Sequence, residues 1–223
     1  MDKKDVIHRE TAMELKIRRT MAALEKNNMS AYYAKTGADA VEQVRALMQK
    51  GDVISCGGSV TLDATGVKAL MRSGDYEFLD REACPNREAQ QELYRKVFSA
   101  DVFLTSTNAV TENGELYNVD GNGNRVAAML FGPKKVIVVA GYNKIVRDLD
   151  AAADYVRSVA TPANAFRLGL STPCTQGACP GTGKEMCAGC ASESRICSLF
   201  TVMARQGNKG RVHVILVGEE IGY

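Results

Sequence analysis

Five of the seven cysteines of this 223-residue chain lie within one short segment near its end. Cys187 and Cys190 form a CxxC pair, which Cys174 and Cys179 precede and Cys197 follows. A CxxC pair lets two thiolates bind one metal, and two further cysteines complete the four-thiolate set that holds Zn²⁺ or a [4Fe–4S] cluster. A disulfide, a redox-active pair and free thiols are the alternatives. The spacing favours a metal centre and does not choose between zinc and an iron–sulfur cluster.

A second candidate site is the run Cys56–Thr61, which directly follows an expected strand. Gly57 and Gly58 let backbone N–H groups approach a ligand closely, and Ser59 and Thr61 add hydroxyl donors beside a helix N-terminus. This composition predicts an anion-binding loop. The alternative is a tight strand-to-helix turn in which one of the hydroxyls caps the helix.

A third candidate is the carboxylate of Glu112, in the run Thr107–Glu115. It immediately precedes Asn113-Gly114, a dipeptide typical of two-residue hairpin turns. A carboxylate in this position can act as a base or a nucleophile where the site is partly desolvated. The alternative is an exposed hairpin carboxylate.

Two more polar loops follow further along the chain. Asn118–Val126 contains Asn124 and Arg125, and a guanidinium can bind a phosphate or carboxylate through two hydrogen bonds. Asn143 and Lys144 follow the strand expected at 135–140, and the lysine is a further partner for an anion. Open α/β sheets bind ligands beyond the carboxyl ends of their strands, so these loops together predict one site for a small anion.

The elements that must position these loops alternate along the chain. This alternation predicts an α/β fold, a single domain with a mostly parallel sheet flanked by helices and a cysteine-rich insertion before the last strand. We divide residues 1–223 into a helical region (1–50), an α/β core (51–170), the cysteine-rich segment (171–200) and a final strand (210–217). Helices are expected at 6–26, 39–50, 62–71, 87–98, 125–130 and 148–158, an extended piece at 32–33, strands at 52–56, 76–79, 102–105, 135–140 and 211–217, and a hairpin at 109–117.

The composition is that of an ordinary soluble protein, with 45% hydrophobic and 24% charged residues. The chain carries 28 Lys+Arg against 26 Asp+Glu, and this balance provides no electrostatic footprint for nucleic acid or an anionic membrane. No apolar run approaches the roughly 20 residues of a membrane helix. The start, Met1–Asp5, is charged with both signs and does not read as a signal peptide. We therefore expect a cytoplasmic protein without a membrane span.

Taken in order, several blocks of the sequence resemble the lactate-utilisation (LUD-domain) family over nearly the whole chain. The matching blocks are Gly57–Leu62, Thr111–Gly114, Asn118–Val126, Phe131–Val136, Gly141–Val146, Thr172–Cys174, Arg195–Cys197 and Val217–Glu219.

The resemblance implies a fold of the NagB/RpiA/CoA-transferase type. It also implies a role in oxidising L-lactate or a related organic acid to pyruvate or its equivalent, beside partner subunits that carry iron–sulfur clusters. The family subgroup with this C-terminal segment has cysteines that match Cys174, Cys187, Cys190 and Cys197, so these four become the expected metal ligands. Cys179 is an additional cysteine.

A second, shorter resemblance concerns Thr111–Gly114. It is similar to the Ser-Glu-Asn-Gly motif of class I CoA-transferases, whose glutamate forms an acyl-CoA thioester, and it implies that role for Glu112. Three hypotheses follow. The protein binds a small organic acid in lactate-type oxidation, it is a zinc or iron–sulfur redox or assembly protein, or it is an enzyme acting on an acyl-CoA or a sugar phosphate.

Overall fold

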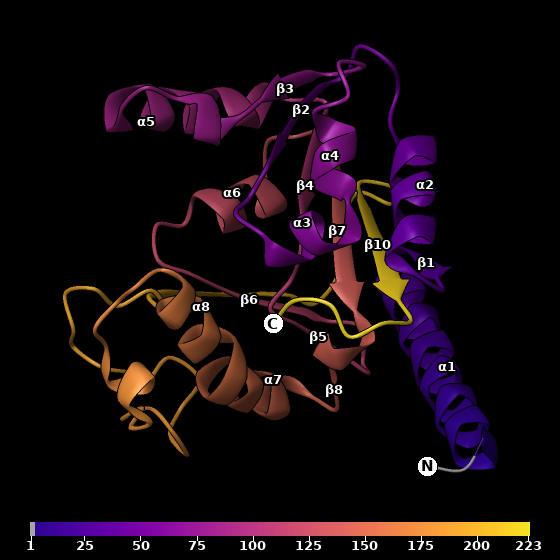
Figure 1. Ribbon diagram of the computed structural model, residues 1–223, viewed down its shortest axis with the longest axis vertical. Helices are drawn as coiled ribbons and strands as arrows, with labels where there is room; N and C mark the ends of the chain where they lie inside the picture. Colours follow the sequence, from indigo (N-terminus) through magenta and orange to yellow (C-terminus); the bar gives the residue numbers. More distant parts are fainter. Residues whose placement is uncertain (1–2) are drawn as a thin grey trace.

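A parallel six-stranded sheet forms the centre of the molecule (Figure 1). The computed structural model describes residues 3–223, so Met1 and Asp2, at the start of the charged N-terminal run, lie outside the described residues. Neighbouring strands pair in parallel throughout, in the order β1-β10-β7-β4-β2-β3. Their bounds are β1 Ser30–Ala34, β2 Val53–Cys56, β3 Glu77–Leu79, β4 Val102–Thr105, β7 Lys135–Gly141 and β10 Val212–Val217.

Helices cover both faces of this sheet, and the side chains of β7 divide between the two cores. Val136 and Val138 pack in one core with residues of α1 and α6, whereas Ile137 and Val139 pack in the other with residues of α2, α3 and α4. A continuously apolar strand is expected where both faces are buried, and the structure confirms the mostly parallel α/β fold. The helices are α1 Lys3–Lys26, α2 Gly37–Leu47, α3 Val60–Thr65, α4 Val67–Met71, α5 Arg87–Lys96, α6 Asn124–Leu130, α7 Leu149–Tyr155 and α8 Thr161–Arg167.

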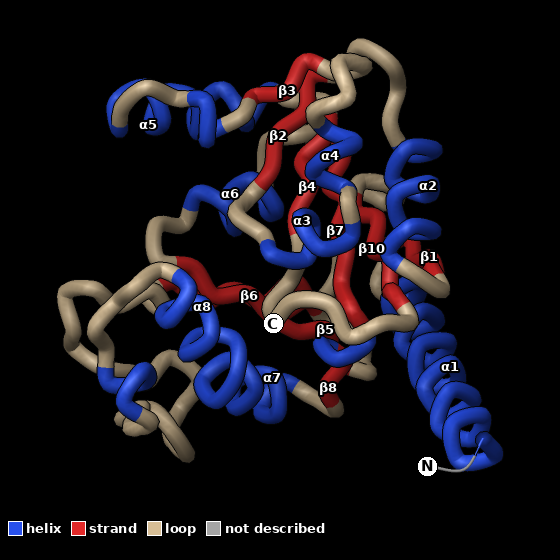
Figure 2. The backbone as a smooth tube through the Cα atoms, viewed as in Figure 1, coloured by secondary structure: helices blue, strands red, loops and turns tan. Residues whose placement is uncertain are grey.

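A second, smaller sheet lies beyond the carboxyl ends of the first (Figure 2). Its strand order is β8-β5-β6-β9, and β5 and β6 form the expected antiparallel hairpin. The connection is longer than the expected two-residue turn, because the N–H of Thr111 bonds to the carbonyl of Glu115 and leaves residues 112–114 as the loop. Strand β9 was not expected. It lies between the cysteine-rich segment and β10, so this segment does not directly precede the final strand. The residues of β9 are exposed or only partly buried apart from one methionine, so its apolar pattern is weak. The bounds are β5 Ala109–Thr111, β6 Leu116–Asp120, β8 Ile145–Val146 and β9 Leu199–Met203.

Two expected helices differ in extent from the observed ones. The helix expected at 62–71 is divided into α3 and α4 at Gly66, whose φ of 86° is left-handed and ends the first helix. The helix expected at 148–158 continues through a π-helical turn, Val156–Ala160, into α8. Pro162 lies in the first turn of α8, directly after the π-helical turn, and has no N–H to donate to that turn. Across residues 3–223, no helix combines the length and apolar character needed to cross a membrane.

Candidate functional site

A polar cavity of about 670 Å³ lies at the carboxyl ends of the parallel strands. The loops after β2, β3, β4 and β7 contribute Ser59, Arg81, Asn108 and Lys144 to its wall. The loop between β6 and α6, helix α8 and the C-terminal tail complete the wall. This edge of the sheet is where open parallel sheets bind their ligands.

Six of the residues predicted to bind a ligand line this one cavity: Gly58, Ser59, Thr61, Asn124, Arg125 and Lys144. Gly57 lies just behind them, since a Cβ at this position would be 2.7 Å from Cδ of the arginine. The hydroxyl of Ser59 also accepts a hydrogen bond from the backbone N–H of Leu62 at 3.3 Å and so caps α3. The loop after β2 is therefore both a helix cap and part of the cavity wall.

Arg125 is held by the protein itself. Its Nε donates to Asp120 Oδ1 at 2.9 Å, and its Nη1 donates to Asn118 Oδ1 at 2.6 Å and to the carbonyl of Ser106 at 3.0 Å. Its Nη2 donates to Asn108 Oδ1 at 3.0 Å. Since these contacts occupy all three nitrogens, Arg125 joins the loop after β4 to strand β6 and is not a free anion ligand.

Lys144 has the most unusual environment in the cavity wall, because it is only 2% exposed. Its Nζ donates to Thr61 Oγ1 at 3.1 Å, Ser106 Oγ at 3.0 Å and the carbonyl of Thr107 at 3.2 Å. Among the described residues no carboxylate pairs with it. Burial, with the positive charge of Arg125 adding to it, lowers the pKa of this amine to about 7. Near neutral pH the amine is therefore present in both its neutral and its charged form.

Three cationic side chains in the wall, Arg81, Arg167 and Arg195, were not among the predicted site residues. The guanidinium of Arg81 lies against Gly58, where a Cβ would overlap it. Arg167 donates from Nε and Nη2 to Asn164 Oδ1, at 3.1 and 2.8 Å. Among the side chains of residues 7–223, no carboxylate pairs with any of these arginines. Arg81 comes two residues after β3, so the same strand-end reasoning that identified the other loops could have found it.

The C-terminal tail closes one side of the cavity. Asn143 donates from Nδ2 to the carbonyl of Gly222 at 2.9 Å, and its Oδ1 accepts from the N–H of Ile221 at 3.1 Å. Asn143 therefore anchors the tail instead of lining the cavity as predicted. Tyr223 does line it, and the tyrosine hydroxyl is buried with no hydrogen-bond partner in the part of the chain that the structure describes. An orphaned buried hydroxyl in a cavity wall indicates a place for a ligand or a water molecule.

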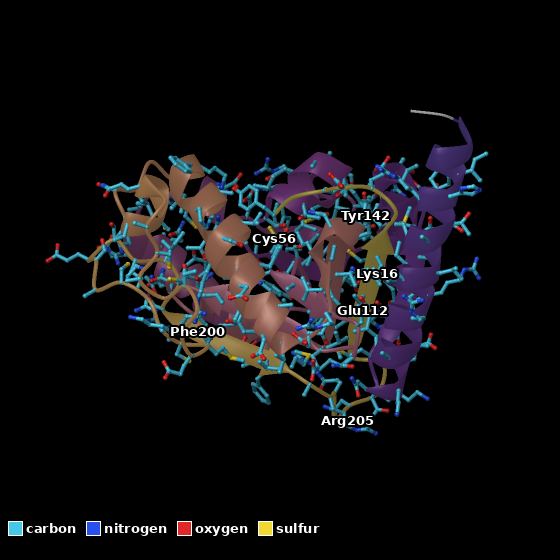
Figure 3. All side chains as sticks on the ribbon, turned by 90° about the horizontal axis from the view of Figure 1, so that it is seen from below. Lys16, Cys56, Glu112, Tyr142, Phe200 and Arg205 are labelled. Carbon is cyan, nitrogen blue, oxygen red and sulfur yellow. The ribbon has the colours of Figure 1, made fainter. Side chains whose placement is uncertain are left out.

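Glu112 lies away from this cavity, on the side of the molecule where α1 packs (Figure 3). Its carboxylate is one-third exposed and faces Lys16 Nζ at 3.8 Å and Arg19 Nη2 at 3.7 Å. Asn27 donates to the carbonyls of the Asn113-Gly114 turn, which holds the turn against α1. The start of β5 and the end of β6 lie at the cavity, and the turn between these strands lies at the opposite end of the hairpin. Glu112, Asn113 and Gly114 are therefore separated from the other predicted residues.

The cysteine-rich segment encloses a second, much smaller cavity of about 20 Å³. Four cysteines line it: Cys174, Cys179, Cys190 and Cys197. Cys187, a predicted ligand, is exposed and is not part of this wall, and all seven cysteines are free thiols. Over the described residues no three cysteine, histidine or acidic side chains come within reach of a single metal ion. The donor set is that of a thiolate centre, and thiolates serve zinc and iron–sulfur clusters alike.

Two arginines hold this segment through its backbone carbonyls. Arg195 donates to the carbonyls of Cys190 at 3.0 Å, Cys197 at 2.9 Å and Cys187 at 3.2 Å. Arg157 is 8% exposed and donates from Nη1 to the carbonyl of residue 184 at 2.9 Å. Because Arg195 also lines the large cavity, it connects the cysteine segment to that cavity.

Comparison with known proteins supports the family resemblance. A family model described as the LUD domain matches residues 17–217. A solved structure of a DUF162 family protein from Deinococcus radiodurans is similar at 15% identity and a TM-score of 0.48, covering 94% of this chain and 98% of that one. The structure of eIF2B delta from Chaetomium thermophilum matches at 20% identity and a TM-score of 0.32, covering 50% and 49%. No curated protein matches the chain.

Proposed function

This chain belongs to the LUD domain family, and we propose that it binds a small organic-acid anion in the large cavity and serves the oxidation of L-lactate or a related acid. One observation carries the binding proposal. Arg81, Lys144 and Arg167 line one cavity, and among the described side chains, those of residues 7–223, no carboxylate pairs with any of them. Cationic groups without an internal partner are complemented by an anion from outside.

The other polar groups of the wall suit the same ligand. Two carboxylates, Asp120 and Glu193, also line the cavity. Asp120 is paired with Arg125, with Oδ1 2.7 Å from Nη2, and the remaining basic side chains outnumber Glu193, so the wall keeps a surplus of positive charge. The volume falls within the roughly 300–1,000 Å³ of small-molecule sites and exceeds that of a three-carbon acid. The cavity therefore also has room for a longer acid or for a phosphate-bearing ligand.

Calorimetric titration of the purified protein with L-lactate, pyruvate and inorganic phosphate tests this proposal. Each charge-assisted hydrogen bond contributes about 1.5–3 kcal/mol, so Arg81→Met and Arg167→Met should each weaken anion binding by about tenfold to a hundredfold. Arg72→Met is the matched control, because this exposed arginine pairs with Asp80 and Glu82 outside the cavity. Absence of binding by all three anions, or equal affinities in all variants, would contradict the site.

The metabolic part of the proposal rests on the family and needs a test in cells. Deletion of the gene in the organism that encodes it should impair growth on L-lactate as the carbon source. Complementation with the natural protein should restore growth, and complementation with the double variant Arg81→Met/Arg167→Met should not. Normal growth of the deletion strain on L-lactate and on related 2-hydroxy acids would refute this role.

The cysteine segment supports a second candidate function, a thiolate-bound iron–sulfur cluster or zinc ion that serves electron transfer or assembly with iron–sulfur partner subunits. The observation in its favour is that four thiols line one small cavity. Cys174, Cys190 and Cys197 belong both to this wall and to the set that the family resemblance implies, and the two sets differ only in Cys179 or Cys187. Metal analysis and visible absorbance after anaerobic purification should detect the centre, and Cys179→Ser against Cys187→Ser should identify its fourth ligand. Colourless, metal-free protein would remove this candidate.

A further inference from the structure

The amine of Lys144 is buried beside the large cavity and held there by hydrogen bonds. All three of its hydrogen-bond partners, Thr61, Ser106 and Thr107, belong to residues that line the large cavity. The C-terminal tail covers it from another side, since a Cβ at Gly222 would lie 3.3 Å from Nζ. The amine is thus fixed in position, shielded by the tail and next to the space that a ligand would occupy.

A second lysine in the same protein shows what a purely structural arrangement looks like. Lys68 has a side chain that is 12% exposed, and its ammonium bonds to Glu82 and faces Asp63 at 3.7 Å. Lys144 is more deeply buried and has only neutral oxygens around it. Burying an amine without a counter-ion costs stability, and such a cost is commonly retained where the neutral amine has chemistry to perform.

We propose that Lys144 is a nucleophile that forms an imine with a carbonyl-bearing organic acid, such as a 2-oxo acid, bound in the large cavity. This inference rests on the proposed anion site, in which Arg81 and Arg167 hold the carboxylate and leave the adjacent carbonyl for the amine. A lowered pKa supports it, because at a value of about 7 a large share of the amine carries a free lone pair at neutral pH.

The step balances without an oxidant or a reductant. The nitrogen lone pair forms a bond to the carbonyl carbon, and the electrons of the C=O π bond move onto the oxygen. A proton then moves from nitrogen to this oxygen, which becomes a hydroxyl. Loss of that hydroxyl with the second nitrogen proton releases one water molecule and leaves the C=N bond. The hydroxyls of Thr61 and Ser106, at 3.1 and 3.0 Å from Nζ, are placed to relay these protons.

Trapping with a hydride donor tests the proposal on the full-length protein. The protein is incubated with pyruvate and sodium cyanoborohydride near neutral pH, and its intact mass and peptide map are then measured. We expect one dominant adduct with the mass of the reduced imine, located at Lys144 in the natural protein. Lys144→Gln should lose this adduct, whereas Lys68→Gln should retain it. The peptide map of the natural protein gives the answer even where the Lys144 variant folds poorly.

Titration with L-lactate, which has the carboxylate but no carbonyl, separates this inference from the anion site. Binding of L-lactate without a pyruvate adduct at Lys144 would overturn the imine and leave the anion site standing. An adduct spread over surface lysines, unchanged in Lys144→Gln, would overturn it as well. Failure of both anions to bind, together with the absence of the adduct, would overturn both proposals.

Discussion

Replacing the buried amine by an isosteric apolar side chain, Lys144→Met, should change how the stability of the protein depends on pH. The ordinary pKa of a lysine is 10.5, and in the folded protein that of Lys144 is about 7, because burial and the charge of Arg125 disfavour the ammonium form. Asp120, a carboxylate of the same cavity wall, is paired with Arg125 and not with Lys144. Between pH 7 and 10.5 the unfolded chain therefore binds a proton at this lysine that the folded chain does not.

The sign and size of the effect follow from proton linkage. The unfolding free energy rises with pH wherever the unfolded state binds more protons, by about 1.4 kcal/mol per pH unit for one group. The natural protein should gain about 2–3 kcal/mol from this lysine between pH 7.5 and 9.5, and Lys144→Met should lack that gain. Below pH 7 Lys144 is protonated in both the folded and the unfolded natural protein. The cost of burying its charge then lowers the unfolding free energy by the full amount. The variant's stability relative to the natural protein should thus be greatest at or below pH 7 and fall as the pH rises.

Urea denaturation followed by circular dichroism at half-unit steps from pH 6.5 to 9.5 measures this difference. The variant also leaves the hydroxyls of Thr61 and Ser106 without their amine partner, which adds an offset of about 1–3 kcal/mol that does not depend on pH. The slope is therefore the readout, and Val139→Ala, a core change without a titratable group, is the pH-independent reference. A stability difference that stays constant over the range would refute a neutral buried amine.

Three other substitutions test the remaining architecture. Arg125→Met should lower the unfolding free energy, measured by urea denaturation, by about 3 kcal/mol. This is the lower end for a broken buried ion pair, because two backbone N–H groups still donate to Asp120. A loss below about 1 kcal/mol would mean that the hydrogen bonds of Arg125 add little to stability. Gly114→Ala should lower the thermal midpoint, since φ is +80° and the new Cβ would lie 2.6 Å from a carbonyl oxygen of α1; an unchanged midpoint would show that the turn does not pack against that helix. Arg157→Met should speed hydrogen exchange in residues 180–190, because it removes the donors to the carbonyls there; exchange that is accelerated equally across the chain would point to general destabilisation instead.

Much of the fold is determined locally and could be predicted from the sequence. The apolar run of β7 requires burial on two faces, and the Asn-Gly dipeptide favours a hairpin, so both features appear where the pattern indicates. The position of Lys144 directly after β7 also puts it at the carboxyl ends of the parallel strands, where the sequence places it. The short strand β9 was missed because its residues are only partly buried and its pattern is correspondingly weak.

Which residues share a site depended on tertiary structure. By residue type Arg125 was expected to bind an anion and Glu112 to act as a base or nucleophile. The fold surrounds Arg125 with acceptors and carries Glu112 to the far end of a hairpin, beside α1. Hydrogen-bond saturation and ion pairing are set by contacts between segments far apart in the chain, and spacing in the sequence carries no record of them. The sequence by itself determined an α/β protein of the LUD domain family with a basic strand-end site and a thiol-rich segment. Only the three-dimensional packing decided that Lys144 is buried without a counter-ion and that Arg81 and Arg167 join it, because burial and charge balance arise from the assembled chain.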